Sequence, residues 1–293
     1  MSNLLMVLLS KRPALAGTVA IGAFVALFAV ASPAAGIEPI SAETCARMAA
    51  GNTISPTNPV GCDRLRTVSF DFSSVDGSPG RGSVVVLDAV APAVAAIFDT
   101  LHARGFPLEQ ARPLEYFNGD DNASMDANNT SAFNGRVIAG TTSISMHAYG
   151  VAIDISPAWN PNIDINSDGT AVISPARAAH SHVNRQEPRA GRPDRPGMVE
   201  AVREVFEDHG FLQWGGDWNF PVDYQHFQIG TRALTEALVA LPPAQGEAAY
   251  GRYVSDFHRC LATPGLPVDP AARRRACVAE SIARTSPAAS PLR

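Results

Sequence analysis

The sequence predicts an α+β fold, because segments with strand periodicity and segments with helix periodicity are interspersed along the chain. Residues 66–74 ("RTVSFDFSS") alternate apolar and polar side chains, as a half-buried strand does. Residues 197–211 ("GMVEAVREVFEDHGF") carry apolar residues at helical spacing and stop at Gly210. The chain has 293 residues, of which 46% are hydrophobic, enough for one large domain or two small ones.

The N-terminal segment has the order of an export signal. Lys11 and Arg12 precede an apolar run of roughly 18 residues that ends in small residues. We expect residues 1–36 to be a signal peptide, cleaved near Ala34 or Ala35, or else an uncleaved membrane anchor. In either case the body of the protein would be exported, and so periplasmic, associated with the cell wall or secreted.

The four cysteines agree with export, because an even number in an exported chain indicates disulfides. They are Cys45, Cys62, Cys260 and Cys277, and they allow three pairings. We favour Cys45–Cys62 and Cys260–Cys277, since each pair flanks the central body. Residues 37–65 would then be a disulfide-stapled lead-in. The absence of a C-x-x-C arrangement argues against a thiolate zinc site or a redox centre.

The remaining elements follow in chain order. The segment from Gly82 starts as a strand, continues as an amphipathic helix to about His102 and stops near Gly105. Residues 117–135 are rich in turn formers and predict a loop. Residues 151–155 and 226–230 predict short strands. Residues 231–293 form a helical C-terminal extension, with a break at Pro242–Pro243 and a disordered tail over the last ten residues.

The charge distribution argues against a nucleic-acid partner. The net charge is −5, and no basic stripe is present. The arginine-rich stretches 184–195 and 272–276 are short, and the first is broken by prolines and acids. Both are typical of solvated surface.

Two stretches carry residue types suited to metal-assisted hydrolysis. "SISMHAYGVAIDIS" (143–156) contains His147 and Asp154, and "WGGDWNFPVDYQHF" (214–227) contains Asp223 and His226. Two histidines and one carboxylate are a common ligand set for catalytic zinc, and a second carboxylate can take the proton of the metal-bound water. These four residues fill the four roles. For Asp223 and His226 to share a face, the chain must turn at 223–225 before the strand begins.

The two stretches together resemble the M15 family of zinc peptidases, which includes D-alanyl-D-alanine carboxypeptidases and L-alanyl-D-glutamate endopeptidases. The pattern S-x-H-x-x-G-x-A-x-D runs from Ser145 to Asp154, and "WGGDW" followed by D-x-x-HF comes some sixty residues later. These segments look most like the endolysin-related branch. The resemblance covers residues 66–230, which we take as the peptidase domain.

The resemblance implies a role for each matching residue. It makes His147, Asp154 and His226 the zinc ligands and Asp223 the general base. It suggests Arg136 as the substrate-binding arginine, with Arg112 as a competitor, and Ser145 as a hydrogen-bonding neighbour of the site. The residues expected to shape the substrate pocket, with core packing as the alternative for the tryptophans, are Trp214, Asp217 and Trp218.

The resemblance also implies an architecture and a substrate. The architecture is a small, mainly antiparallel sheet with helices packed on one side and a zinc cleft on the sheet, shared with hedgehog-type domains. The substrate is a peptidoglycan stem peptide, cut by a D,D-carboxypeptidase or an endopeptidase. The alternative is a non-catalytic cell-wall or ligand-binding protein that keeps a structural zinc. Asp223 argues against this alternative, because a binding module needs ligands but no base.

Two further motifs give weaker indications. "DINSDG" (Asp164 to Gly169) copies the first half of a calcium loop, but its twelfth position is Pro175, so the bidentate glutamate is missing. A turn rich in Asp and Asn is the favoured interpretation. His180 and His182 form an H-S-H pair without a nearby carboxylate pattern, which is typical of surface histidines.

Overall fold

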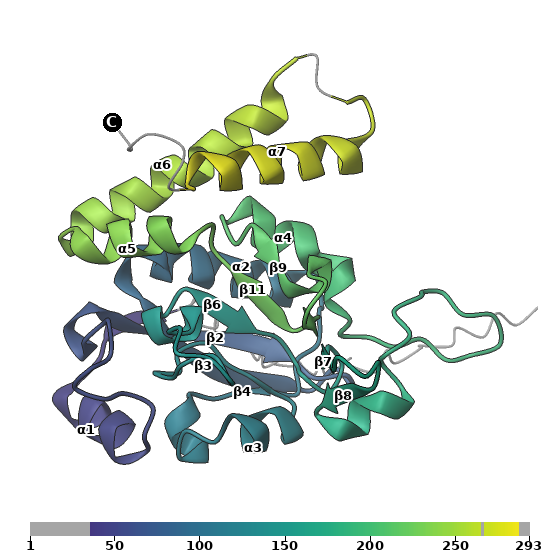
Figure 1. Ribbon diagram of the computed structural model, residues 1–293, viewed down its shortest axis with the longest axis horizontal. Coiled ribbons are helices and arrows are strands. Elements are labelled where there is room, and N and C mark those ends of the chain that lie inside the picture. Colours follow the sequence, from purple (N-terminus) through teal and green to yellow (C-terminus); the bar gives the residue numbers. More distant parts are fainter. Residues whose placement is uncertain (1–35, 265–266, 287–293) are drawn as a thin grey trace, which may run out of the picture. The chain divides into compact units, whose positions relative to one another are not determined.

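The computed structural model describes residues 36–264 and 267–286 (Figure 1). The predicted signal peptide or anchor lies outside these residues, except for Gly36, and so does most of the predicted disordered tail. The α+β class is as predicted. The elements, in chain order, are β1 (Gly36–Pro39), α1 (Ala42–Ala50), β2 (Leu65–Ser73), β3 (Pro79–Leu87), α2 (Ala91–Ala103), β4 (Gln110–Ala111), α3 (Asp121–Asp126), β5 (Asn129–Thr130), β6 (Ala152–Asp154), β7 (Asn162–Ile165), β8 (Ala171–Ser174), α4 (Arg203–Asp208), β9 (Gln213–Trp214), β10 (Val222–Asp223), β11 (His226–Gln228), α5 (Arg232–Ala240), α6 (Pro243–Ala262) and α7 (Pro270–Arg284).

The largest sheet is antiparallel and has the strand order β1-β2-β3. The alternation expected for residues 66–74 is present in β2, whose apolar side chains Val68 and Phe70 are buried. Helix α2 packs on β2, and the ring of Phe70 stacks on that of Phe98 with 3.7 Å between centroids. Burial of such aromatic pairs is a main source of core stability. The helix ends before Gly105, which has a positive φ of 66°.

The lead-in is joined to this sheet. Strand β1 pairs with β2, with Ile37 opposite Val68. A disulfide links Cys45, in α1, to Cys62, just before β2. Inside the loop that this disulfide closes, the Thr53 carbonyl accepts a hydrogen bond from the Gly135 amide, and the Asn58 side-chain amide donates to the Ala148 carbonyl. The lead-in thus contacts the segment that carries His147.

A second antiparallel sheet has the order β6-β11-β9 and forms the floor of the functional site. In the register, His226 is opposite Asp154 and Phe227 is opposite both Ile153 and Trp214. Because side chains alternate along a strand, the polar residues point to one face and the apolar residues to the other. The apolar face packs into the core, where Phe227 stacks on Phe206 of α4 at 3.9 Å.

Two further sheets contain the remaining strands. The antiparallel sheet β10-β7-β8 places Asp223 opposite Asn162, beside the functional site. The parallel pair β4-β5 joins Gln110 to Asn129. In Figure 1, β7 and β8 lie to the lower right of β6 and β11.

The described part of the C-terminal extension consists of the helices α5, α6 and α7 (Figure 1). The chain breaks between α5 and α6 at Pro242 and Pro243, as the sequence predicted. A disulfide between Cys260 and Cys277 joins α6 to α7. Both disulfides therefore follow the local pairing that we favoured. Within the described residues, none of the helices combines the length and apolar character needed to cross a membrane.

Two segments differ from the sequence expectation. The predicted loop 117–135 contains the short helix α3, which starts because the Asp120 side chain accepts a hydrogen bond from the Ala123 amide. Its sequence lacks the apolar periodicity that would reveal a helix. The predicted helix 197–211 begins as a 3₁₀ turn at Val199–Val202 and becomes α-helical at Arg203.

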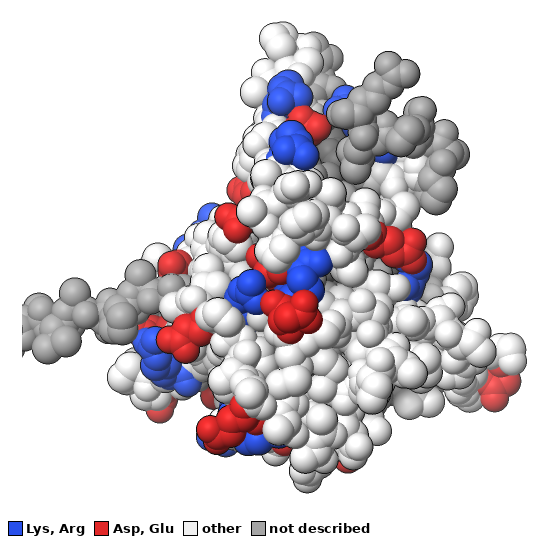
Figure 2. Space-filling model, turned by 90° about the vertical axis from the view of Figure 1, so that its left-hand side faces the viewer, with Lys and Arg blue, Asp and Glu red and all other residues white. Residues whose placement is uncertain are grey.

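The surface charges are mixed in sign. On the face drawn in Figure 2, Lys and Arg side chains lie next to Asp and Glu side chains, without a continuous basic stripe.

Candidate metal centre and active-site cleft

His147 is held by a short 3₁₀ turn that spans Met146–Tyr149. Ser145 caps the turn, because its Oγ accepts a hydrogen bond from the His147 amide at 3.2 Å. Gly150 ends the turn with a φ of 71°, and a Cβ there would lie 2.6 Å from the Leu87 backbone nitrogen. The Ser and Gly of the motif therefore fix the backbone on both sides of the histidine.

Three buried donor residues converge from separate elements. His147 Nε2 lies 3.1 Å from His226 Nδ1 and 3.2 Å from Asp154 Oδ2, and His226 Nδ1 lies 3.1 Å from Asp154 Oδ1. In a tetrahedral site with metal–nitrogen and metal–oxygen bonds of about 2.0–2.1 Å, donor atoms lie roughly 3.3 Å apart. The observed distances, each to one of the two Asp154 oxygens, are therefore close to the spacing of donor atoms around zinc. Among the described residues, His147, Asp154 and His226 form the group of possible metal ligands whose ligand atoms all lie within 4.8 Å of one another.

The second nitrogen of each imidazole is engaged elsewhere. His147 Nδ1 lies 2.5 Å from the Ala132 carbonyl, and His226 Nε2 lies 2.9 Å from Gln228 Oε1. An oxygen acceptor at these positions requires N–H on the imidazole. The facing nitrogens, His147 Nε2 and His226 Nδ1, are then the ones that can offer a lone pair to a metal ion.

The charge of Asp154 is stabilised where it lies. Burial alone would raise the pKa of its carboxyl, but His147 and His226 hold that pKa well below its ordinary value. For His226, burial acts to lower the pKa, yet the Asp154 carboxylate raises it overall. Asp154 is therefore an anion beside two nitrogen donors, which suits it to a divalent cation.

Asp223 lies close to this group without belonging to it. The chain turns at residues 224–225 between β10 and β11, as predicted, so that Asp223 and His226 line the same cleft. The Asp223 carboxyl has a pKa raised to about 6, first by burial and then by repulsion from Asp154. Its Oδ1 is buried without a hydrogen-bond partner. A carboxylate of raised pKa is a stronger base than an exposed one.

The glycines of "WGGDW" allow the chain to pass this close to Asp223. A Cβ on Gly215 would lie 2.3 Å from the Asp223 backbone oxygen, and a Cβ on Gly216 would lie 2.3 Å from the Trp214 ring. Neither position has room for a side chain, so both glycines are needed for packing.

The cleft above the donor group has a volume of about 620 Å³. Arg136 lines it, and its Nη2 pairs with Asp121 Oδ2 of α3 at 2.7 Å. The Nε of Arg136 is buried without a partner. The competing Arg112 lies outside the cleft, over the Tyr116 ring. The lining residues are Asp121, Asn122, Met125, Arg136, Ile138, Ala139, Thr141, Ser145, Met146, His147, Asp154, Asn162, Asp164, Ser174, Trp218, Phe220, Pro221, Asp223, Gln225, His226 and Gln228.

The three expected pocket-shaping residues divide into two kinds. Trp218 lines the cleft, with its ring centroid 5.1 Å from that of His226. Trp214 is buried on the apolar side of the sheet and donates from Nε1 to the Tyr224 carbonyl. Asp217 points away and pairs with Arg203 at 2.6 Å. The structure thus brings Trp218 to the cleft and gives Trp214 and Asp217 positions outside its lining.

The weaker motifs do not gather metal-ligand sets. In "DINSDG", the Asp168 carboxylate accepts from the Thr170 amide and hydroxyl, which closes the β7–β8 hairpin as an ordinary Asx turn. His182 Nδ1 lies 2.7 Å from Ser181 Oγ. Neither histidine of the H-S-H pair belongs to the donor group found among the described residues.

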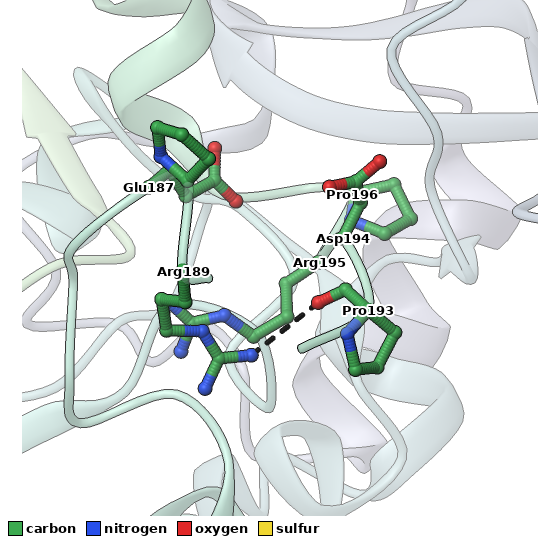
Figure 3. A pocket seen from close by; sticks show the side chains of 7 residues that line it. Glu187, Arg189, Pro193, Asp194, Arg195 and Pro196 are labelled. Atoms are coloured by element: carbon green, nitrogen blue, oxygen red, sulfur yellow. Dashed lines mark hydrogen bonds between the residues drawn. The ribbon is translucent and has the colours of Figure 1, made fainter. Parts of the chain in front are cut away.

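A second cavity lies in the loop of residues 187–196 (Figure 3). Its arginines bind backbone carbonyls of their own neighbourhood. Arg195 donates to the Ser181 and Gln186 carbonyls, and Arg189 donates to the Pro193 carbonyl. These bonds hold the loop together, so we assign this cavity a structural role.

Several site residues were missed by reasoning from the sequence. Gln228 follows His226 by two positions on a strand, which places both side chains on one face, and that spacing could have revealed it. Gln225 and Asn162 line the cleft beside Asp223 and act to lower its pKa, against the larger effect of burial. Asp121, the partner of Arg136, lay hidden in a segment predicted as loop.

Fold and site together define the class of protein. An α+β framework carries a buried His–Asp–His donor group and a separate carboxylate in one cleft, as metal-dependent hydrolases do. Residues 139–229 match a family described as D-alanyl-D-alanine carboxypeptidase. This match confirms the resemblance to the M15 peptidases for that segment, which contains all three donors and Asp223 but not Arg136. Comparisons with curated proteins and with solved structures found no match.

Proposed function

We propose that the protein is an exported zinc-dependent peptidase that hydrolyses peptide bonds in peptidoglycan stem peptides. The observation that carries the proposal is the arrangement of His147, Asp154 and His226 close to the spacing of donor atoms around zinc, with Asp223 in the same cleft. The family match over residues 139–229 supports a peptidase and its substrate class.

The donor group fits zinc by chemistry as well as by spacing. Two imidazole nitrogens and one carboxylate are the ligands of many catalytic zinc sites, which leave a fourth position open. Such a zinc would lower the pKa of a bound water to about 7 and polarise the substrate carbonyl. Its ligands here would be His147 Nε2, His226 Nδ1 and Asp154.

Asp223 supplies the proton transfer. Asp223 lies on the cleft wall, and one of its carboxylate oxygens, Oδ1, lacks a hydrogen-bond partner. The carboxylate can therefore accept the proton of the attacking water. It can then return this proton to the departing amine. This two-step use of one carboxylate needs no covalent intermediate with the enzyme, so no serine is required as a nucleophile.

Arg136 is suited to hold the substrate. Its guanidinium lies on the cleft wall, is kept in place by Asp121 and retains a buried Nε–H without a partner. A guanidinium in this position can bind a substrate carboxylate or a polarised carbonyl oxygen. Both D,D-carboxypeptidase and endopeptidase substrates offer such groups.

The disulfides support an exported location. Both cysteine pairs are oxidised in the structure, and disulfides persist in oxidising compartments outside the cytoplasm. This agrees with the export signal expected in residues 1–36 and with a cell-wall substrate.

Digestion of purified peptidoglycan, with the products identified by mass, tests the proposal. Loss of a terminal D-alanine would indicate a carboxypeptidase, and cleavage within the stem would indicate an endopeptidase. A chelator should abolish either product, and added zinc should restore it. Zinc binding without any product would favour the alternative of a binding protein that keeps a structural zinc.

A further inference from the structure

We propose that Gln228 and Gln213 form a hydrogen-bonded chain that fixes His226 in the tautomer that binds metal through Nδ1. The proposal rests on the metal centre described above and adds two positioning residues to it. The chain runs from His226 Nε2 to Gln228, then to Gln213, and ends on the backbone carbonyl of Gly230.

The sheet places these side chains in a row. His226 and Gln228 are two residues apart on β11, so they point to the same face. Gln213 lies directly opposite Gln228 on the neighbouring strand β9. The distances along the row are 2.9 Å from His226 Nε2 to Gln228 Oε1, 3.3 Å from Gln228 Nε2 to Gln213 Oε1, and 2.6 Å from Gln213 Nε2 to the Gly230 oxygen.

The direction of every bond follows from the last one. A backbone carbonyl can only accept, so the Gln213 atom beside Gly230 must be the amide NH₂. The Gln213 oxygen then faces Gln228 and requires an NH₂ there, which turns the Gln228 oxygen toward His226. An oxygen acceptor at Nε2 requires N–H on that nitrogen. His226 Nδ1, which faces His147 and Asp154, is then the nitrogen that can give its lone pair to a metal. Without a metal, Asp154 Oδ1 at 3.1 Å can accept a proton from the same nitrogen.

The opposite orientation would weaken the metal site. If the Gln228 amide flipped, its NH₂ would face Nε2, and the proton of a neutral imidazole would move to Nδ1. A metal would then have to displace that proton in order to bind. The two histidines differ in this respect, because His147 is fixed directly by the Ala132 carbonyl, whereas His226 depends on two side chains. Side-chain partners of metal ligands typically contribute 10–100-fold in metal affinity.

The first test reads the position of the His226 proton with zinc bound. Nitrogen-15 NMR of the zinc-loaded full chain should show His226 protonated at Nε2, and this proton should exchange slowly with solvent because Gln228 Oε1 accepts it. Its signals can be assigned by their loss in His226→Gln. In Gln228→Leu at saturating zinc the same proton should exchange faster. A wild-type protein with zinc on Nε2 and the proton on Nδ1 would overturn the proposal.

The second test measures zinc affinity by competition with a chelator in the same chain. Gln228→Leu should weaken zinc binding by about 10–100-fold. Gln228→Glu keeps an acceptor for Nε2–H and should retain affinity close to wild type. Gln213→Leu frees the Gln228 amide to flip and should cost less than Gln228→Leu. Gln245→Leu changes an exposed glutamine on α6 and serves as the matched control.

A double variant distinguishes a chain from two separate effects. Once Gln228 is removed, Gln213 has no route to His226, so Gln213→Leu/Gln228→Leu should bind zinc like Gln228→Leu alone. Additive losses, or zinc binding by Gln228→Leu at wild-type strength, would show that the chain does not position His226. Zinc binding with the expected losses in the glutamine variants, but without hydrolysis of stem peptides, would contradict the proposed function and leave the chain in place.

Discussion

Two aspartates in one cleft have opposite electrostatic environments, and their roles follow from this difference. Asp154 is flanked by two imidazoles that lower its pKa, and it stays ionised as a ligand should. Asp223 is partly buried and repelled by Asp154, which raises its pKa to about 6. Environments that push the pKa values of two nearby acids apart are a mark of divided roles in catalysis.

Exchange of each carboxyl for an amide should separate these roles. Asp223→Asn should keep zinc, because all three donors remain, and should lose about 10²–10⁴-fold in turnover, because an amide cannot accept the proton. Asp154→Asn should weaken zinc binding first, with activity partly restored by added zinc. Zinc content and turnover on a stem peptide, measured for both variants, test these two assignments. If Asp223→Asn lost its zinc while Asp154→Asn kept it, the assignments would have to be exchanged.

At the scale of elements, the motif S-x-H-x-x-G-x-A-x-D describes a local structure as much as a ligand set. Ser145 caps the 3₁₀ turn, Gly150 ends it in a left-handed conformation, and Asp154 lies at the end of the strand that follows. The spacing between the two ligands is therefore set by one turn and one short strand.

Alanine at Gly150 should disturb both folding and metal binding. The residue would be strained at a positive φ, and its Cβ would meet the Leu87 backbone nitrogen at 2.6 Å. Gly77 is a matched control, since its φ is 81° but nothing lies within 4 Å of a Cβ there. Gly77→Ala should cost about 1 kcal/mol of unfolding free energy. Gly150→Ala should cost at least twice as much and should also weaken zinc binding, as measured by denaturant unfolding and chelator competition. Equal losses in both variants would contradict this account.

The element pattern shows which features a sequence can predict. Strand β2 and helix α2 have long, periodic apolar patterns, and the bounds of β2 and the end of α2 were predicted to within a few residues. Helix α3 depends on a single capping side chain, which leaves no periodic pattern. The donor residues were predictable because their types and spacing are chemically restricted. The Gln213–Gln228 pair depends on strand register, which only the folded chain reveals.

At the scale of the whole molecule, one buried ion pair ties the C-terminal extension to the largest sheet. The Arg64 guanidinium binds the buried Asp88 carboxylate in two places and donates to the carbonyls of Leu238 and Val239 at the end of α5. The pKa of Arg64 is raised, chiefly by its hydrogen bond to Asp88. Asp88 directly follows β3, so this arginine joins three parts of the chain.

Removal of this arginine should destabilise the fold strongly. Arg64→Leu leaves a buried carboxylate without its main partner, and such losses typically cost about 3–5 kcal/mol. Arg47→Leu is the control, because Arg47 pairs with the exposed Glu43 on α1 and should cost less than about 1 kcal/mol. Denaturant unfolding at a fixed zinc concentration measures both. A similar small loss in the two variants would mean that Arg66, the other arginine near Asp88, is a sufficient partner.

The two disulfides should contribute equally to stability but differently to function. Each joins cysteines 17 residues apart, so in the chain-entropy model each contributes about 3 kcal/mol. The Cys45–Cys62 loop, however, contains Thr53 and Asn58, which hydrogen-bond to Gly135 and Ala148 beside the metal centre. The Cys260–Cys277 bond joins two helices outside the cleft lining.

Paired replacement by serine should reveal this difference. Both double variants should lose similar unfolding free energy in denaturant. At temperatures where each remains folded, Cys260→Ser/Cys277→Ser should keep wild-type zinc affinity and activity. Cys45→Ser/Cys62→Ser should bind zinc more weakly, because the loop that supports the segment 135–148 becomes free to move. Chelator competition on the folded proteins measures the effect, and non-reducing peptide mapping confirms which bond remains. Equal zinc affinities would show that the His147 turn holds its position without the lead-in.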